Sequence, residues 1–364
     1  MIRAATTCDI FCRVVDNYGD IGVAWRLARQ LTHDHQLTVR LIVDDLASFS
    51  VLEPTINNSS PSQVVGGVTV ISWPQSSAAT PADLVIETFA VNLPEPFMAA
   101  MAAKVTPPVW INLEYLSAES WIGEHHLLPS PHPKLSLTKY FFFPGFTRDT
   151  GGLIRERELI AEREAYVLSN NADKLQVFLF GYRNAACETL LQAMCESKAP
   201  IRCTIPESAL AGSLKQVGEW PNNLSANFEV ETIPFCAQHA FDRLLWRHDV
   251  LFVRGEDSFV RAQWAAKPFV WQIYPQPDDV HWTKLNAFLS LYCDGLENKA
   301  AMALQNLWCA WNAEDCTNIV SAWGQFVTQL PTLKKHAKAW ADKLVEMPDL
   351  AANLLSFYQK TTKI

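Results

Sequence analysis

The sequence lacks several patterns that assign a function on sight. None of its nine cysteines forms a CxxC pair, which disfavours a zinc knuckle. It has no GxGxxG motif, so the glycine fingerprint of a dinucleotide-binding dehydrogenase is missing. No stretch approaches the roughly 20 apolar residues that a membrane-spanning helix needs. These absences disfavour small zinc modules, Rossmann dehydrogenases and integral membrane proteins.

Positive charge is also scarce. The chain has 30 Lys and Arg against 38 Asp and Glu, a formal net charge of -8. General nucleic-acid binding requires a basic surface and is disfavoured, whereas a basic protein partner stays compatible. The odd number of cysteines suits reduced thiols, and the first residues lack the apolar segment of a signal peptide. We therefore expect a soluble, cytoplasmic protein.

What the sequence does contain is two successive series of strand-like segments. Its 364 residues exceed the usual size of one hydrophobic core. Near-continuous apolar runs alternate with helical patterns, as in parallel sheets covered on both faces. The strands are predicted at 9–15, 37–43, 68–73, 83–89 and 108–116, then at 174–182, 201–205, 227–235, 249–255 and 268–275.

The predicted organisation is an α/β chain of two domains. A Pro-, Gly- and Ser-rich region at 129–158 separates the two series of strands and indicates loops around a boundary. We predict an N-terminal domain at 1–160 and a second domain at 161–345. A helical tail follows at 346–364.

The first candidate site follows the first strand. In open α/β sheets, ligands bind beyond the carboxyl ends of the strands, so residues that directly follow strands are informative. Here the segment is DNYGDIG, which places Asp16 and Asp20 around a glycine turn. Asp20 can cap the next helix, and the residues alone favour this structural interpretation. The alternative is a carboxylate that orients or deprotonates an acceptor.

The second candidate site follows the strand DVLFV. It consists of Arg254, Gly255, Glu256, Asp257 and Ser258, and a helix begins there. A helix N-terminus presents N–H groups and a partial positive charge, which suit phosphate. Arg254 can add a bidentate fork, Ser258 a hydroxyl, and Glu256 can accept hydrogen bonds from sugar hydroxyls. A helix capped by Asp257 or Ser258 is the alternative, and both interpretations can hold together.

Aromatic residues follow two other strands of the second series. A single Phe usually belongs to the core. At a strand end, however, Phe180 or Phe235 can stack on a flat base, which is worth roughly 1–3 kcal/mol. Tyr182 can donate its hydroxyl to a phosphate. The histidines at 125, 126 and 132 complete no metal-ligand set, so no metal site is predicted.

Taken together, these segments resemble the bacterial elongation factor P arginine rhamnosyltransferases, the EarP family. The combination of DNYGDIG with RGEDSFVRAQ is highly specific for that family. Segment 56–67 and the part after about 290 carry little motif information. In chain order, the matching motifs are FCRVVDNYGDIGVAWRLARQL, VIETFA, INLEYLSAESW, KYFFFPGF, GGLIRERE, LFGYR, IPF, RGEDSFVRAQWA and WQIYPQ.

The resemblance implies a GT-B glycosyltransferase, with two Rossmann-like domains facing across a cleft. Such an enzyme transfers L-rhamnose from dTDP-β-L-rhamnose to one arginine of elongation factor P, with inversion at the anomeric carbon. The modification activates the factor for translation of polyproline stretches. The first domain is then the acceptor-binding one, the second binds the nucleotide sugar, and the tail packs back on the first. No cofactor and no divalent metal are expected.

The resemblance also implies roles for individual residues. Asp20, with Asp16, is the base or acceptor-orienting group, and Glu256 acts against the donor. Phe235 stacks on thymine, with Gln238 nearby. The other substrate-binding residues that it implies are Asn17, Tyr18, Gly19, Phe180, Tyr182, Arg254, Gly255, Asp257 and Ser258.

Two alternatives stay open at this point. One is another GT-B transferase with a different nucleotide sugar or acceptor, which competition by dTDP against UDP and GDP would distinguish. The other is a non-catalytic nucleotide-sugar-binding module, which would bind the donor and add no mass to elongation factor P.

Overall fold

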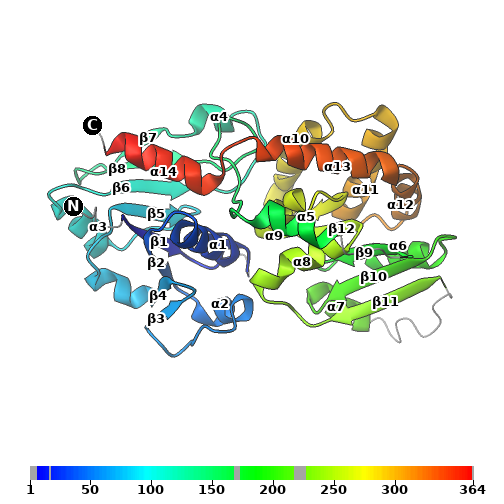
Figure 1. Cartoon of the computed structure of the whole chain (residues 1–364), viewed down its shortest axis with the longest axis horizontal. Helices are drawn as coiled ribbons and strands as arrows, with labels where there is room; N and C mark the ends of the chain where they lie inside the picture. Colours follow the sequence, from blue (N-terminus) through cyan, green and yellow to red (C-terminus); the bar gives the residue numbers. More distant parts are fainter. Residues whose placement is uncertain (1–5, 16–17, 168–172, 217–226, 363–364) are drawn as a thin grey trace. The chain divides into compact units, whose positions relative to one another are not determined.

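The computed structural model describes residues 6–15, 18–167, 173–216 and 227–362. The contacts divide the chain into two compact units (Figure 1). Unit 1 comprises Met1–Arg157 together with Met347–Ile364, and unit 2 comprises Glu158–Glu346. The chain therefore passes from one unit to the other twice, and its last helix belongs to the unit in which the chain begins.

Unit 1 is built on a sheet whose described strands follow the order β3-β4-β2-β1-β5-β6-β8-β7. The strands are β1 (Thr7–Cys12), β2 (Thr38–Val43), β3 (Ser62–Val65), β4 (Val68–Ser72), β5 (Leu84–Thr88), β6 (Val109–Leu113), β7 (Pro129–Pro131) and β8 (Thr138–Phe142). The helices are α1 (Gly19–His33), α2 (Leu46–Leu52), η1 (Trp73–Ala78, a 3₁₀ helix), α3 (Glu95–Ala103), α4 (Ile122–His125) and α14 (Leu350–Thr361). Only the two edge pairs, β3 with β4 and β7 with β8, are antiparallel among these strands.

The central strands of unit 1 form because apolar side chains cover both of their faces. β5 and β6 are buried along their whole length. Phe11 of β1 packs edge-on against Phe97 of α3 and Trp73 of η1, with ring centroids 4.8 and 5.5 Å apart. Helix α1 packs on β1 and β2. These contacts fix the positions at which the strands end.

The region 129–158, predicted as loops, in fact contains two strands. β8 pairs in parallel with β6, and β7 pairs antiparallel with β8. The proline content of β7 obscured it, because proline cannot donate a hydrogen bond to a neighbouring strand. An edge strand tolerates this defect, and β7 lies at the edge of the sheet.

The C-terminal helix α14 is held to α1 by the GGLIRERE segment. Leu350 N–H donates to the carbonyl of Leu153 at 2.9 Å. Gly152 has a φ of +76° and lies so close to Pro348 that a Cβ would meet its carbonyl oxygen at 2.7 Å. Glu156 accepts two hydrogen bonds from the buried Arg26 of α1, at 2.6 and 2.7 Å. Gly152 therefore permits a close approach to Pro348 that a larger residue would block.

Unit 2 contains a parallel sheet in the order β11-β10-β9-β12-β13. The strands are β9 (Leu175–Leu179), β10 (Ile201–Pro206), β11 (Phe228–Ile233), β12 (Val250–Arg254) and β13 (Phe269–Gln272). The helices are α5 (Leu159–Val167), α6 (Cys187–Cys195), α7 (Ala209–Gln216), α8 (Gln238–Arg247), α9 (Gly255–Ala265), η2 (Pro277–Asp279), α10 (His281–Tyr292), α11 (Asn298–Asn312), α12 (Ile319–Thr328) and α13 (Leu330–Val345). The strand order reverses between β9 and β12, so ligand residues are expected at the carboxyl ends of these two strands.

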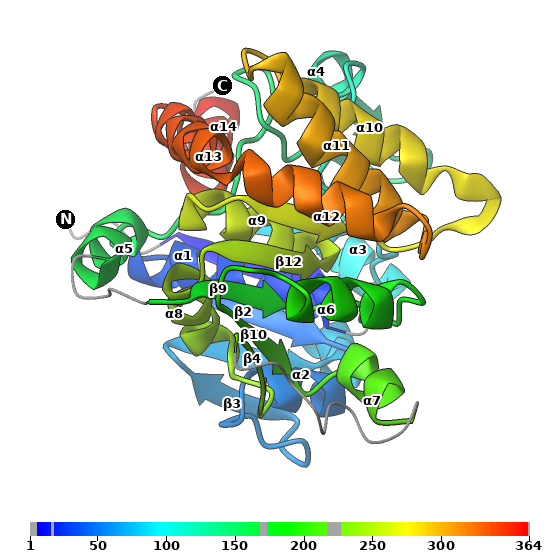
Figure 2. The same ribbon diagram turned by 90° about the vertical axis from the view of Figure 1, so that its right-hand side faces the viewer.

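Helices α10 to α13 gather on the β13 side of this sheet, as both ribbon views show (Figure 2). α11 packs on β13, and α13 packs on α9. An aromatic cluster fills the layer: the ring of Phe288 lies 4.7 Å from Phe259, 5.7 Å from Trp308 and 6.1 Å from Trp340. This packing fixes α9, whose first turn follows the end of β12.

Two further findings concern the exclusions made from the sequence. No helix within the described residues is long and apolar enough to cross a membrane. All nine cysteines are present as free thiols.

Candidate functional site

Asp20 lies in the first turn of α1, 2% exposed, close to the carboxyl end of β1. Its Oδ2 accepts a hydrogen bond from Val15 N–H at 2.9 Å, which joins the carboxylate to the segment entering the turn. The N-cap of α1 is Tyr18, with helical dihedral angles and no side-chain capping bond. The prediction that Asp20 caps the helix is therefore wrong. The reason is that α1 already begins at Gly19, so Asp20 is the second residue of the helix and not its cap.

A tyrosine from a distant strand holds the second oxygen of Asp20. Tyr115, just after β6, donates its hydroxyl to Asp20 Oδ1 at 3.3 Å. The Tyr115 ring stacks on Phe89, with centroids 4.2 Å apart and planes 12° apart. Phe89 and Ala90 both have left-handed φ values, 57° and 55°, which are costly for non-glycine residues. Tyr115 of the INLEY motif therefore contacts Asp20, and Phe89 of the VIETFA motif supports Tyr115. The sequence did not assign this supporting role to either motif.

Replacing Tyr115 by Phe tests whether its hydroxyl orients Asp20, and it should leave the fold intact. The ring would keep its stack on Phe89, and the hydrogen bond to the Asp20 carboxylate would be lost. A hydrogen bond of this kind is worth about 1 kcal/mol, so we expect about a fivefold fall in kcat with little change in KM. Steady-state kinetics and thermal unfolding of Tyr115→Phe, beside Tyr140→Phe as a control, would measure this. A fall in kcat as large for Tyr140→Phe would contradict the assignment.

Further charged groups lie at the same edge of the sheet in unit 1. Glu87 of β5 is paired with Lys139 of β8 at 2.5 Å. Burial raises the pKa of Glu87, and Lys139 opposes this shift. Burial also raises the pKa of Glu114, which accepts a hydrogen bond from Asn112. Glu87 near the end of β5, Glu114 directly after β6 and Asp20 after β1 therefore place three carboxyl groups near the carboxyl ends of neighbouring strands, and Lys139 already neutralises the first of them.

In unit 2, Arg254 stands at the switch point of the sheet. Its guanidinium carbon lies 4.6 Å from the ring centroid of Phe180 and 4.7 Å from that of Tyr182. Both rings follow β9, the strand next to β12. No carboxylate of the described residues forms an ion pair with Arg254. The two aromatic rings thus hold the Arg254 guanidinium in place. Its N–H groups remain available to bind an anion.

The turn after Arg254 is shaped for close approach. Gly255 has a φ of +64°, and a Cβ there would meet the Tyr182 hydroxyl at 3.4 Å. A Cβ at Gly181 would lie 2.6 Å from Gln272 Oε1, which accepts a hydrogen bond from Tyr182 N–H at 2.8 Å. Gln272, at the end of β13, was not predicted as a site residue. The only feature of the sequence that could have identified Gln272 is the WQIYPQ motif, which contains it.

The RGEDS turn is not capped in the way the alternative interpretation required. The N-cap of α9 is Arg254, whose side chain makes no capping bond. Asp257 Oδ2 instead accepts hydrogen bonds from Arg261 Nε at 2.9 Å and Gln238 Nε2 at 3.1 Å. Asp257 and Gln238 therefore tie the first turns of α8 and α9 together. This leaves the first turn of α9 as a helix N-terminus beside Arg254, the arrangement that suits phosphate.

The remaining predicted residues fall into three groups. Asp16 and Asn17 lie outside the described residues. Tyr18 and Gly19 form the start of α1, and Glu256 and Ser258 lie partly buried in the first turn of α9. The Phe235 ring, partly exposed after β11, lies 6.5 Å from Phe180. Within the described ranges, no group of three or more His, Cys, Asp or Glu could hold a metal ion.

Comparison with known proteins decides the family. The family model described as Elongation-Factor P (EF-P) rhamnosyltransferase EarP matches residues 8–359. The chain belongs to this family. Members named protein-arginine rhamnosyltransferase include one from Pseudomonas putida, which is 44% identical over 376 residues and aligned over 98% of this chain and 99% of its own. One from Shewanella oneidensis is 41% identical over 392 residues, covering 98% of each chain.

Solved structures confirm the fold. One described as the structural basis for EarP-mediated arginine glycosylation of translation elongation factor EF-P has a TM-score of 0.67 at 33% identity, over 97% of this chain and 99% of that one. MurG of Acinetobacter baumannii, at 12% identity over 99% of this chain and 100% of its own, has a TM-score of 0.52. This second likeness concerns the fold alone.

Family membership confirms three of the predictions made from the sequence. The chain is a GT-B-type α/β protein, it is a glycosyltransferase, and its type is that of the protein-arginine rhamnosyltransferases. The alternative of a non-catalytic module is therefore set aside. The roles of individual residues stay predictions. The contacts described above supply physical reasons for them.

Proposed function

We propose that the enzyme transfers L-rhamnose from dTDP-β-L-rhamnose to an arginine of elongation factor P, with inversion. The observation that carries the donor half is Arg254, held between Phe180 and Tyr182 at the start of α9. The family description and the solved relative, both of which refer to elongation factor P, support the acceptor. Because that acceptor is a translation factor, the enzyme would work in the cytoplasm.

In this proposal unit 2 binds the nucleotide. The diphosphate accepts hydrogen bonds from Arg254 and from the N–H groups of the first turn of α9. Thymine stacks on Phe235, and Glu256 accepts hydrogen bonds from the sugar hydroxyls. These cationic and dipolar groups offset the diphosphate charge without a divalent cation. Transfer that is unchanged by EDTA would agree with this expectation.

Replacing Phe235 by Ala should weaken the binding of dTDP. Stacking of a base on an aromatic ring contributes at least about 1 kcal/mol, so we expect a rise in Kd of fivefold or more. Inorganic pyrophosphate offers a matched control because it lacks the base. Calorimetry should therefore find its affinity equal in wild type and in Phe235→Ala. Equal affinity for dTDP as well would remove the stacking role.

The proposed chemical step is a single in-line displacement. An arginine nitrogen forms a bond to C1 of rhamnose while the bond from C1 to the diphosphate oxygen breaks, and dTDP leaves. A guanidinium has a pKa above about 12, so a carboxylate cannot deprotonate it before the reaction. Asp20 instead holds the guanidinium through charge-assisted hydrogen bonds. It then accepts the proton as the C–N bond forms.

The intact mass of elongation factor P, measured after incubation with the enzyme and dTDP-rhamnose, tests the whole proposal. We expect a gain of one deoxyhexose, which fragmentation places on an arginine. Competition by dTDP that exceeds competition by UDP and GDP would support the donor. An unchanged mass with dTDP-rhamnose, alongside a gain with another nucleotide sugar, would refute it.

A further inference from the structure

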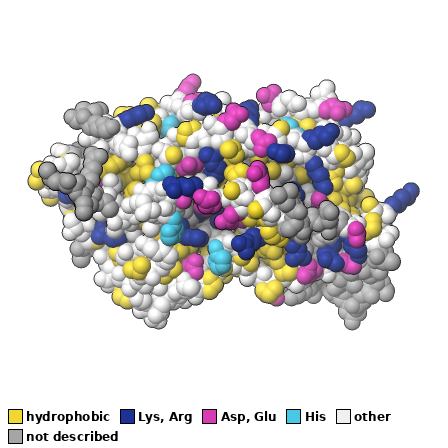
Figure 3. Space-filling view, viewed as in Figure 1, with side chains coloured by type: hydrophobic (Ala, Val, Ile, Leu, Met, Phe, Trp, Pro, Cys, Tyr) yellow, Lys and Arg dark blue, Asp and Glu magenta, His cyan; other side chains and the backbone are white. Residues whose placement is uncertain are grey.

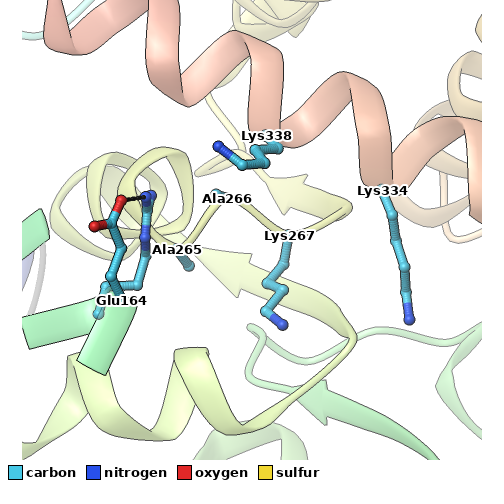
Figure 4. A pocket seen from close by; sticks show the side chains of 7 residues that line it. Glu164, Ala265, Ala266, Lys267, Lys334 and Lys338 are labelled. Carbon is cyan, nitrogen blue, oxygen red and sulfur yellow. Dashed lines mark ion pairs between the residues drawn. The ribbon is translucent and has the colours of Figure 1, made fainter. Parts of the chain in front are cut away.

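Unit 2 contains a hollow, formed where α5, the end of α9 and α13 meet. Its volume is about 470 Å³, within the range of small-molecule sites. Ala265 and Ala266 give it an apolar wall (Figure 4). Its charged lining consists of Arg163, Glu164, Lys267, Lys334 and Lys338.

This hollow lies at the amino ends of the strands, and the proposed donor residues lie at their carboxyl ends. Lys267 stands two residues before β13, and Asp249, which pairs with Lys334, stands directly before β12. Phe180 and Arg254, in contrast, stand at the carboxyl ends of β9 and β12. The hollow and the donor residues therefore lie at opposite ends of β12, and the hollow is not part of the donor site.

Most of the charges around the hollow are paired. Lys334 contacts Asp249 at 2.6 Å. Lys338 contacts Asp342 at 2.7 Å, and both of these side chains are more than half exposed. Such exposed pairs contribute little and exchange easily for a stronger anion. On the face drawn in Figure 3, Lys and Arg side chains lie over the region of α13 and are interspersed with Asp and Glu side chains.

Arg163 already has a structural role. It donates to the carbonyl of Trp264 at 2.8 Å, near the carboxyl end of α9, and contacts Glu164 at 3.6 Å. This bond offsets the partial negative charge of the helix end, which would otherwise oppose an anion. Arg163 therefore removes an obstacle to anion binding in the hollow.

Lys267 differs from the other cations of the hollow. Among the described residues, it has no hydrogen-bond or ion-pair partner. Burial lowers its pKa, Lys334 and Arg163 lower it further, and Asp249 opposes them. In Figure 4 the side chains of Lys267 and Lys334 extend in the same direction from their two elements. A half-buried ammonium without a partner is costly, and an anion beside it would remove that cost.

We propose that this hollow is a binding site for a small phosphate-bearing anion, with Lys267 as its central ligand and Lys334 and Lys338 at its rim. The alanine wall leaves room for a carbon skeleton, so both an inorganic diphosphate and an organic bisphosphate fit the chemistry. α5 follows the first passage between the units and α13 precedes the second. An anion here would tie these two connecting helices to each other.

Calorimetric titration of the full chain loaded with one equivalent of dTDP tests the site, because the donor residues are then occupied and no excess dTDP competes for the hollow. Inorganic pyrophosphate and fructose 1,6-bisphosphate serve as the two probes and distinguish an inorganic from an organic source. We expect at least one to bind, and we expect Lys267→Gln to weaken it at least tenfold. Lys299→Gln, an exposed lysine on α11, is the control and should leave the affinity unchanged.

A second measurement does not depend on a variant. Acylation of lysines at neutral pH, read by peptide mass spectrometry, should modify Lys267 readily, and the bound probe should protect it. Two results would overturn the proposal: neither probe binds to the enzyme loaded with one equivalent of dTDP, or Lys267→Gln binds the probe as tightly as wild type.

Discussion

Asp20→Asn is expected to bind dTDP as wild type does and to lose most of its transfer activity. Asparagine keeps the shape of the side chain, its amide oxygen can still accept from Val15 N–H, and its NH2 group can donate to the Tyr115 hydroxyl oxygen. It cannot accept the proton that leaves the arginine nitrogen, and it lacks the charge that holds the guanidinium. A positioned general base contributes about 10²–10⁴-fold, so a fall in kcat of that order is expected.

Asp45→Asn provides a matched control for this measurement. Asp45 caps α2 in the same unit by accepting from Ala47 and Ser48 N–H, and asparagine caps helices equally well. Its activity should match that of wild type. Near-normal transfer by Asp20→Asn, with dTDP affinity retained, would rule out Asp20 as the proton acceptor.

Arg254→Ala is expected to weaken dTDP binding by about 100-fold, because each charge-assisted hydrogen bond contributes roughly 1.5–3 kcal/mol. Arg254→Lys should recover only part of the loss, since an ammonium is a point charge and lacks the planar fork. The aromatic pair that holds Arg254 would remain, so the fold should be little changed. Calorimetry with dTDP, repeated at higher salt, measures the effect.

Arg247→Ala is the control for this substitution. Arg247 lies in the same unit and pairs with Glu231 at 3.3 Å, with both side chains more than one-third exposed. Its removal should leave dTDP affinity unchanged. A loss in Arg254→Ala no larger than that in Arg247→Ala would show that Arg254 does not bind the diphosphate.

The strands that the sequence predicted best are those buried on both faces. β5 and β6 appear as apolar runs in the sequence because helices cover both sides of a parallel sheet. β7 was missed because its composition is that of a loop, and only pairing with β8 makes it a strand. Helix starts were also misjudged. Asp20 and Asp257 have the residue type of a cap, but their oxygens bind Val15 and Arg261 instead.

The sequence by itself determined the α/β class, the family and the two segments that carry Asp20 and Arg254. It could do so because these depend on local patterns and on motifs read along the chain. Only the tertiary structure decided what surrounds these two residues. Tyr115 is 95 positions from Asp20, and the rings that flank Arg254 directly follow a neighbouring strand. The order of strands in a sheet sets such contacts, and the spacing of residues along the chain does not record that order.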